Sequence, residues 1–183
     1  MSDLVNWDSF SHGQILSKKW LCAKLEPFLD SEQKIAILGG WYNVLAFMLR
    51  VRDNHQHITS FDSDHTCKKI ADKINDCWVL EKTTHNVVAD VNSLDLSDFQ
   101  VIINTSCEHM PGHWFNTVSS GTIVCLQSSN LDISTHPWYI TNPSTSIKSF
   151  IDKFPMTNVN FVDILNIEYS NWGYKRFMII GEK

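Results

Sequence analysis

The stretch KIAILGGWYNVLAFMLR, from Lys34 to Arg50, decides the fold. Its first part, Ile35–Leu38, is a short apolar run that predicts a buried strand. Gly39 and Gly40 follow, and the apolar spacing of Trp41–Val51 then predicts a helix. A glycine turn between a buried strand and a helix is where α/β proteins hold nucleotide-like ligands. The stretch therefore predicts a sheet protein with a ligand crevice beyond its first strand.

The chain continues as an alternation of strands and helices. A second helix is expected over Cys67–Asn75, with Asp64 and Thr66 marking its start. Further strands, short and rich in Val and Ile, are expected at Ile58–Phe61, Asn86–Ala89, Val101–Asn104 and Gly121–Leu126. Short apolar strands separated by helices suit a parallel sheet that is covered on both faces. The predicted fold class is therefore α/β, with a doubly wound and mostly parallel sheet.

The end of the chain has a different pattern. Val159–Tyr169 and Tyr174–Gly181 read as two strands around the turn Ser170–Gly173. This hairpin completes a seven-stranded sheet and makes part of it antiparallel. We expect residues 1–30 to form an N-terminal helical extension packed on a Rossmann-like domain of residues 31–183. The Ser-, Thr- and Pro-rich stretch Gln127–Ser146 is expected to be a loop or lid.

Composition excludes several classes of protein. The chain has 183 residues and a net charge of −5, so it offers no broad basic face for nucleic acid. No apolar run approaches the roughly 20 residues that span a bilayer, and MSDLVNWDSF lacks the features of a secretory signal. The five cysteines include no CxxC pair, so neither a zinc site nor a disulfide framework is expected. We therefore expect a cytoplasmic protein with reduced cysteines, without a metal, membrane or strong nucleic-acid partner.

Two features of the first two strands point to the ligand. Gly39 and Gly40 let the backbone approach it, and Asp62 follows the second strand about 20 residues later, where an acid binds ribose hydroxyls. Alone, the glycines read equally well as a tight turn, and an aspartate at a strand end as a helix cap or a solvated residue. Together they favour adenosine binding. An NAD-linked oxidoreductase would use the same pair of features.

The order of motifs resembles the class I S-adenosylmethionine-dependent methyltransferase family from about Lys34 to Lys183. KIAILGG resembles its first motif, ITSFDSD its second strand with the ribose-binding acid, and VVADVNSL the segment whose acid, here Asp90, meets adenine. FQVIINTSCEHM is similar to the fourth-strand motif, and NIEYSNWGYKRFMIIGEK to the reversed last two strands. That final hairpin separates this interpretation from a dehydrogenase. The resemblance implies S-adenosyl-L-methionine as cofactor and S-adenosyl-L-homocysteine (SAH) as product.

The resemblance also implies a set of cofactor-binding residues. These are Gly39, Gly40, Trp41, Asp62, Ser63, Asp90, Val91, Asn104 and Thr105. The family commonly has an acid two positions before the first glycine, where this chain has Ile37, and further glycines where it has Trp41-Tyr42. The group that binds the methionine ammonium is therefore open between Asn104, the Trp41 region and the N-terminal segment.

The fourth strand opens into the same crevice through NTSCEHMPGHW, Asn104 to Trp114. Glu108 and His109 are candidate catalytic groups for acid/base work or for positioning the acceptor. His113 and Trp114 are candidates for a wall of the acceptor site. The alternative is structural: Glu108 starts a helix, His109 is a satisfied polar group and His113 is solvated.

Two other segments add candidates for the acceptor side. A helix expected over Gly13–Leu29 presents Gln14 and Lys18 at the polar end of one face, after His12 in the preceding loop. Such a face suits a docking helix equally well. After the fifth strand, His136 and Trp138 are candidates for the wall of a flat or hydrophobic acceptor pocket, or for anchors of an irregular loop.

The resemblance therefore implies a methyltransferase, with a small molecule as the leading hypothesis for the acceptor and a nucleobase or a protein as the alternatives. The Pro-Pro-aromatic motif of enzymes that methylate the amino groups of DNA bases is absent, since NTSC stands at the fourth strand. The alternatives are a catalytically silent protein of the same fold that serves as a binding platform, and other chemistry on S-adenosylmethionine.

Overall fold

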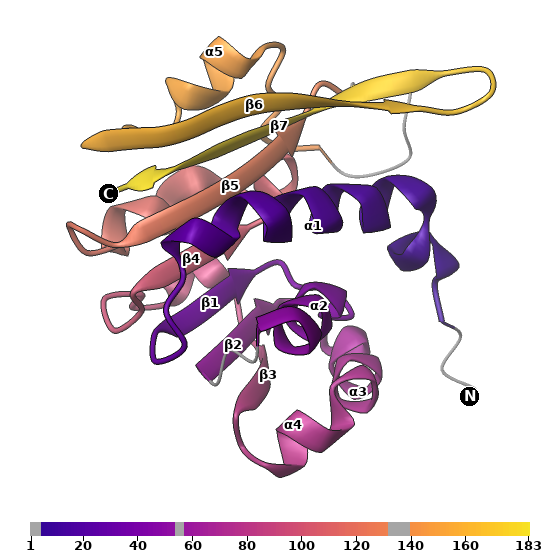
Figure 1. The fold of residues 1–183 in the computed structure, drawn as a ribbon, viewed down its shortest axis with the longest axis vertical. Coiled ribbons are helices and arrows are strands. Elements are labelled where there is room, and N and C mark those ends of the chain that lie inside the picture. The colour runs from indigo at the N-terminus through magenta and orange to yellow at the C-terminus, as the bar shows by residue number, and fades with distance from the viewer. Residues whose placement is uncertain (1–4, 54–56, 132–139) are drawn as a thin grey trace.

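The structure is a computed structural model that describes residues 5–53, 57–131 and 140–183. Within these residues seven strands form one sheet in the order β3-β2-β1-β4-β5-β7-β6 (Figure 1). The strands are β1 (Lys34–Leu38), β2 (His57–Asp62), β3 (Thr84–Val88), β4 (Val101–Asn104), β5 (Ile123–Ser129), β6 (Asn158–Glu168) and β7 (Gly173–Glu182). The first five are parallel, and β7 runs antiparallel to both β5 and β6. The predicted fold class, with its antiparallel C-terminal hairpin, is confirmed.

Helices and short 3-10 turns connect the strands. The helices are α1 (His12–Leu25), α2 (Val44–Asp53), α3 (His65–Ile74), α4 (Asp76–Leu80) and α5 (Ile147–Ile151). The 3-10 turns that matter for the site are η1 (Trp7–Phe10), η3 (Val91–Ser93), η4 (Cys107–His109) and η5 (Gly112–Thr117). Among the described residues, no helix is long and apolar enough to cross a membrane.

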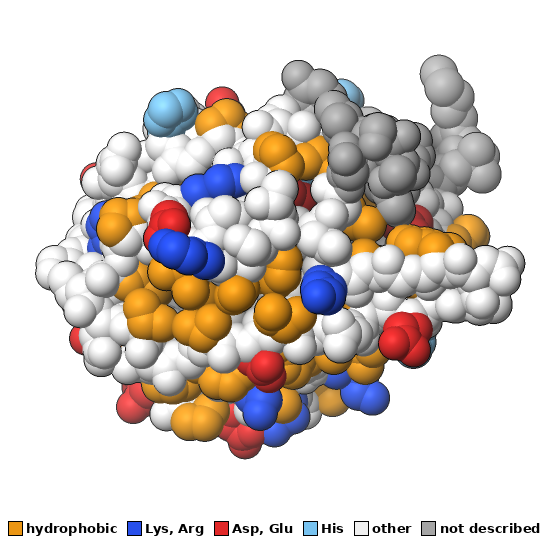
Figure 2. Space-filling view, turned by 90° about the horizontal axis from the view of Figure 1, so that it is seen from above, with side chains coloured by type: hydrophobic (Ala, Val, Ile, Leu, Met, Phe, Trp, Pro, Cys, Tyr) orange, Lys and Arg blue, Asp and Glu red, His pale blue; other side chains and the backbone are white. Residues whose placement is uncertain are grey.

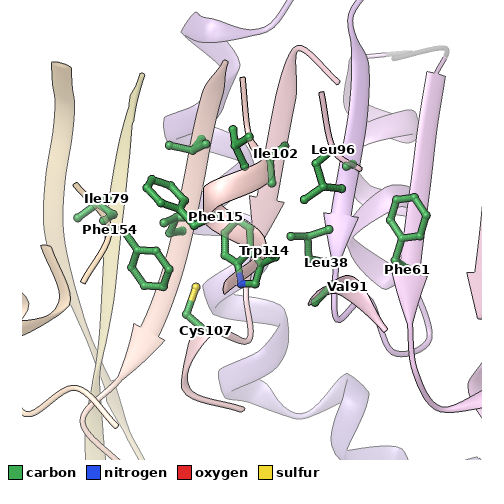
Figure 3. Packing of buried hydrophobic residues seen from close by; sticks show 14 of the residues in the cluster. Leu38, Phe61, Val91, Leu96, Ile102, Cys107, Trp114, Phe115, Phe154 and Ile179 are labelled. Atoms are coloured by element: carbon green, nitrogen blue, oxygen red, sulfur yellow. The ribbon is translucent and has the colours of Figure 1, made fainter. Parts of the chain in front are cut away.

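The sheet has a core on each face because neighbouring residues of a strand point to opposite sides. Ala36 and Leu38 of β1 belong to a cluster with the aromatic side chains of η5 and α5 (Figure 3). Ile35 and Ile37 belong to a second cluster, which includes Leu21, Cys22 and Leu25 of α1 and the apolar face of α2. Helix α1 thus shares a core with the central strands, and it lies along them in Figure 1.

Several boundaries differ from the prediction. Helix α2 begins at Val44 rather than Trp41, because Trp41 (φ 51°) and Asn43 (φ 52°) adopt the left-handed conformation that an α-helix excludes. The first helix ends at Leu25, and a 3-10 turn containing Pro27 follows it. Strand β5 continues to Ser129, three residues into the predicted loop, because Gln127–Ser129 pair with β7.

Strand β6 is one of the two edges of the sheet, and no described strand pairs with its free side. Val159, Val162 and Ile164 of this strand are exposed. Hydrophobic side chains gather on the face of the molecule that carries β6 (Figure 2). All five cysteines are free thiols, and only Cys77 is exposed.

Candidate cofactor and acceptor site

A cavity of about 810 Å³ lies beyond the carboxyl ends of the parallel strands. The loops that leave β1, β2, β3 and β4 all reach it, as the parallel order of the strands requires. Helix α1 and strand β7 supply the opposite wall. The predicted site residues that line this cavity are Gln14, Lys18, Gly39, Gly40, Trp41, Asp62, Ser63, Asp90, Val91, Thr105, Glu108 and His109.

The glycine turn after β1 forms the floor. The N–H groups of Gly39 and Gly40 both donate to the carbonyl of Phe61, at 2.9 and 3.2 Å, so the turn is fixed to β2. Gly39 has a φ of +64°, and a Cβ there would lie 2.8 Å from the Met110 methyl group. A Cβ on Gly40 would lie 1.9 Å from the Ser60 hydroxyl. Gly39 is therefore required by its backbone conformation, and Gly40 because a side chain there would overlap Ser60.

Asp62 holds this turn from the end of β2. Its Oδ2 accepts the N–H of Trp41 at 2.7 Å, and its Oδ1 accepts the N–H of Asp64 at 2.9 Å. An ionised carboxylate has about four acceptor positions, so capacity remains for the hydroxyls of a ribose. Asp64 instead caps α3: hydrogen bonds from Thr66 hold the pKa of its carboxyl below the ordinary value.

The third strand delivers Asp90 to the same rim. Its Oδ1 accepts the N–H of Asn92 at 3.0 Å and so caps η3, and the carboxylate is exposed to the cavity. Val91 follows it and is buried. An acid beside an apolar side chain can bind the amino edge and the face of a flat base.

Asn104 is not among the residues that line the cavity, so the position of its side chain does not support a contact with the methionine ammonium. The side chain is fully buried at the end of β4. Its Oδ1 accepts the N–H of Ser106 at 2.8 Å, and its Nδ2 donates to the Met110 sulfur at 3.2 Å. Asn104 therefore shapes the loop, and its neighbours Thr105 and Ser106 line the cavity instead.

The two candidate catalytic groups sit side by side in η4 with different surroundings. Glu108 is buried, and its Oε1 accepts from Arg176 Nη1 at 2.7 Å and from the Ser129 hydroxyl at 3.0 Å. Arg176 also donates through Nη2 to the carbonyl of Thr105. The side chain of His109 is 40% exposed, and its Nε2 lies 4.0 Å from Glu108 Oε1. The geometry leaves His109 the more accessible group and fixes Glu108 in a network.

Trp114 does not form a wall of the cavity, which corrects the expectation from sequence. It is fully buried in the core on the η5 side of the sheet, against Phe115 and Phe154 (Figure 3). An aromatic side chain in this position gains more from that apolar contact than from a wet cavity. His113 is exposed and is not part of the cavity lining. His136 and Trp138 lie outside the described residues.

Helix α1 brings a buried lysine to the opposite wall. Lys18 is 8% exposed, and its Nζ donates to the Gln14 side-chain oxygen at 2.6 Å. Burial, followed by the positive charge of Arg176, lowers the pKa of Lys18 to about 7. His12, the first residue of the helix, packs edge-on against the ring of Tyr169.

Several lining residues were missed by the sequence interpretation. They are Asp8, Ser11, Met110, Leu131, Ile140, Tyr169, Tyr174 and Arg176. Arg176 had a detectable signature, since it is the one basic residue in the otherwise buried run 176–181 of β7. Asp8, Tyr169 and Tyr174 reach the cavity through the folding of η1 and the β6–β7 hairpin, which no local pattern records.

Comparison with known proteins identified the fold. No family model and no curated protein matches the sequence. The S-adenosylmethionine-dependent methyltransferase SibL matches with a TM-score of 0.63 and 14% identity, over 92% of this chain and 55% of that one. The chain has the fold of S-adenosylmethionine-dependent methyltransferases. It spans about half the length of SibL.

Two further methyltransferases show how widely this fold is used. The magnesium protoporphyrin IX methyltransferase ChlM from Synechocystis PCC 6803, solved with bound SAH, has a TM-score of 0.68 and 10% identity, over 97% of this chain and 88% of that one. An RNA methyltransferase from Salinibacter ruber, in complex with S-adenosyl-L-homocysteine, has a TM-score of 0.53 and 13% identity, over 88% and 91%. At such identities the likeness is one of fold, so the acceptor has to be argued from the cavity.

Proposed function

We propose that the protein is an S-adenosylmethionine-dependent methyltransferase with a small-molecule acceptor. The observation that carries the proposal is the convergence of four strand ends on one cavity, with a bare glycine floor and an acid at the end of β2. Its volume, about 810 Å³, lies within the range of about 300–1,000 Å³ for small-molecule sites. The free cysteine thiols of the protein suit a reducing compartment, so we place the reaction in the cytoplasm.

The residues present fit an adenosyl cofactor. Gly39 and Gly40 line the cavity without side chains, and Asp62 keeps acceptor positions for ribose hydroxyls. Asp90 and Val91 lie where they would bind the edge and face of adenine. Trp41, which could have blocked the crevice, lines it instead, with its N–H held by Asp62.

The main task of the protein in this reaction would be to position the acceptor and the cofactor. The cofactor supplies a methyl group that its sulfonium centre already activates. The chain has to hold the acceptor in line with that methyl group and exclude water. His109, at the accessible side of η4, is placed to take a proton from an acceptor hydroxyl or amine, or to orient it. Glu108 acts as a positioning residue, because its contact with Arg176 ties η4 to β7.

The shape and charge of the molecule support a small acceptor. The acceptor end is closed on one side by α1 and the β6–β7 hairpin, where the Tyr169 hydroxyl accepts the N–H of Gly13 at 3.1 Å. A net charge of −5 disfavours a nucleic-acid acceptor, which needs a broad basic face.

Isothermal titration calorimetry with SAH and with NAD⁺ tests the proposal. SAH binding with no comparable heat from NAD⁺ supports a methyltransferase site, and the absence of SAH binding refutes it. Mass spectrometry of S-adenosylmethionine incubated with candidate acceptors then separates an enzyme from a silent binding protein, which would leave the cofactor intact. Consumption without a methylated product would indicate other chemistry on the same cofactor.

A further inference from the structure

The acceptor end of the cavity contains two buried cations and one buried carboxylate. Lys18 of α1 and Arg176 of β7 are each more than nine-tenths buried, and both line the cavity. Glu108 is the buried carboxylate, and its Oε1 accepts directly from Arg176. A buried charge is costly unless an opposite charge or a set of hydrogen bonds compensates it.

The charges do not balance. Glu108 compensates Arg176, whereas Lys18 donates to Gln14, whose amide oxygen carries no net charge. Within the described residues Lys18 has no salt bridge, and Asp8, which is half-buried, acts on it only at longer range. When Lys18 is protonated, its positive charge is therefore left without a paired anion at this end of the cavity.

Hydrogen-bond donors surround the same place. The hydroxyls of Tyr169 and Tyr174 both lie over Gly13, since a Cβ there would be 2.7 and 2.6 Å from them. Burial raises the pKa of Tyr174, which keeps its hydroxyl protonated and able to donate. The buried Nε of Arg176 has no hydrogen-bond partner among the described residues. The positive N-terminal end of α1 lies beside these groups and adds to their preference for an anion.

We propose that Lys18, Arg176 and the two tyrosines form a subsite for the carboxylate group of the methyl acceptor. The inference rests on the proposed function, and it names the chemical class of the acceptor. A carboxylate fits better than a phosphate because a single negative charge balances the single unpaired cation. A dianion would leave the site with excess negative charge.

The position of the subsite separates it from the adenosine end. Asp62 and Asp90 follow β2 and β3, on one side of β1, whereas Arg176 lies on β7, beyond β4 and β5. Three strand spacings of about 4.8 Å place β7 roughly 14 Å from β1. The cofactor's own methionine carboxylate is the other source of such an anion, and the experiment below distinguishes the two.

Proton uptake is a consequence of this arrangement. An anion beside Lys18 raises the pKa of its ammonium group from about 7, so that binding above pH 7 takes up a proton. The groups whose charges act on Lys18 are Arg176 on β7, Asp8 on η1 and Cys22 on α1, and Glu108 and Tyr174 line the same cavity. Glu108 is already engaged with Arg176, so Lys18 is the group placed to respond.

The test compares benzoate with its neutral isostere benzamide, by calorimetry on the SAH-saturated protein. We expect benzoate to bind about tenfold tighter or more, as for a charge-assisted hydrogen bond, and Lys18→Met to abolish that preference. Lys19→Met, on the exposed side of the same helix, is the matched control and should leave it unchanged. Titrations of the wild type at pH 8.5 in two buffers of different ionisation enthalpy should show proton uptake, a readout that needs no variant.

The outcomes discriminate clearly. Equal affinity for benzoate and benzamide, or benzoate binding without proton uptake at pH 8.5, overturns the inference. If Lys18→Met weakens SAH binding and leaves the benzoate preference intact, the anion is the cofactor's carboxylate and the acceptor assignment is wrong. Failure of the wild type to bind SAH at all is a separate result, which refutes the proposed function itself.

Discussion

Burial disfavours the charged form of the Lys18 ammonium group. The stability of the protein therefore depends on pH. The pKa of the group is about 7 in the folded chain and 10.5 in its ordinary state. Between these values the unfolded chain binds a proton that the folded chain does not, so stability rises with pH across this window. Below pH 7 both states are protonated, and the full cost of burying the charge remains.

The Lys18→Met variant exposes this cost directly. We expect it to be more stable than the wild type at pH 7 in the absence of ligand, and the advantage to shrink by about 2 kcal/mol on going to pH 9. Urea unfolding at the two pH values measures the difference. Lys19→Met, which is exposed, should track the wild type at both. An advantage that grows with pH would contradict the assignment.

Asp62 is expected to serve both the turn and the cofactor. Asp62→Ala removes the acceptor for the N–H groups of Trp41 and Asp64 as well as the proposed contact with ribose. We predict SAH affinity to fall by a few kcal/mol at most, the range for losing charge-assisted hydrogen bonds. Calorimetry of this variant beside Asp98→Ala, an exposed aspartate outside the cavity, tests the prediction. Unchanged affinity would show that the ribose binds elsewhere.

His109 should behave in the opposite way. Its ring is partly exposed and lines the cavity from η4, whereas Asp62 and Asp90 follow β2 and β3. His109→Ala should therefore change SAH affinity by less than about twofold, while lowering the rate of methyl transfer if the ring moves a proton. A large loss of SAH affinity in this variant would place the ring against the cofactor instead.

At the scale of elements, the β1–α2 turn can be tested by substitution of Gly39, with Gly121 as the control. Gly39 and Gly121 both have positive φ, +64° and +83°, but a Cβ on Gly39 meets Met110 and Ser106, whereas one on Gly121 meets nothing within 4 Å. Alanine in the left-handed conformation costs about 1–2 kcal/mol at either position. Only Gly39→Ala should also weaken SAH binding, as calorimetry and urea unfolding of both variants can show. Equal effects on binding would mean that the turn does not contact the cofactor.

The strands could be predicted from the sequence because each is a local pattern. Apolar runs of four to six residues between turn-forming residues gave the sheet, and the pairing Ile35–Leu38 with Ile58–Phe61 follows from two such runs. The start of α2 could not be predicted, since the left-handed residues Trp41 and Asn43 are held by tertiary contacts such as the bond from Trp41 to Asp62. Helix propensity alone predicts a helix that includes Trp41 and Asn43.

The candidate site was predicted where it depends on strand order, and missed where it depends on distant contacts. Parallel strands place their ends at one edge, so Gly39, Asp62 and Asp90 could be grouped without coordinates. Arg176 meets Glu108 across 68 positions of chain, which no local pattern records. Trp114 shows the converse error, because an aromatic next to a predicted crevice suits a wall and a core equally well.

For the whole molecule, the two halves of the sheet carry different parts of the candidate site. The ends of β1, β2 and β3 carry the groups assigned to adenosine, and α1 with β7 carries the buried cations. The segment from Thr105 to Glu108 bridges them, since Arg176 donates both to the Thr105 carbonyl and to the Glu108 carboxylate. The C-terminal hairpin thus completes the site as well as the sheet.

This arrangement predicts where a bound cofactor slows hydrogen exchange. A ligand at about 100 times its Kd stabilises the folded state by about 2.7 kcal/mol, so amides that exchange only by global unfolding should slow about 100-fold. Ile103, fully buried in the central strand β4, should belong to that group. The loops at Gly39–Trp41 and Asp62–Asp64 should gain local protection as well, because they line the cavity.

Amides on the free edge of β6 exchange by local fraying and should keep their rates, since the cavity does not include that strand. Mass spectrometry of exchange with and without SAH measures all three groups together. Protection centred on β6 rather than on the strand ends would move the cofactor out of this cavity, and with it every role assigned to the glycine turn.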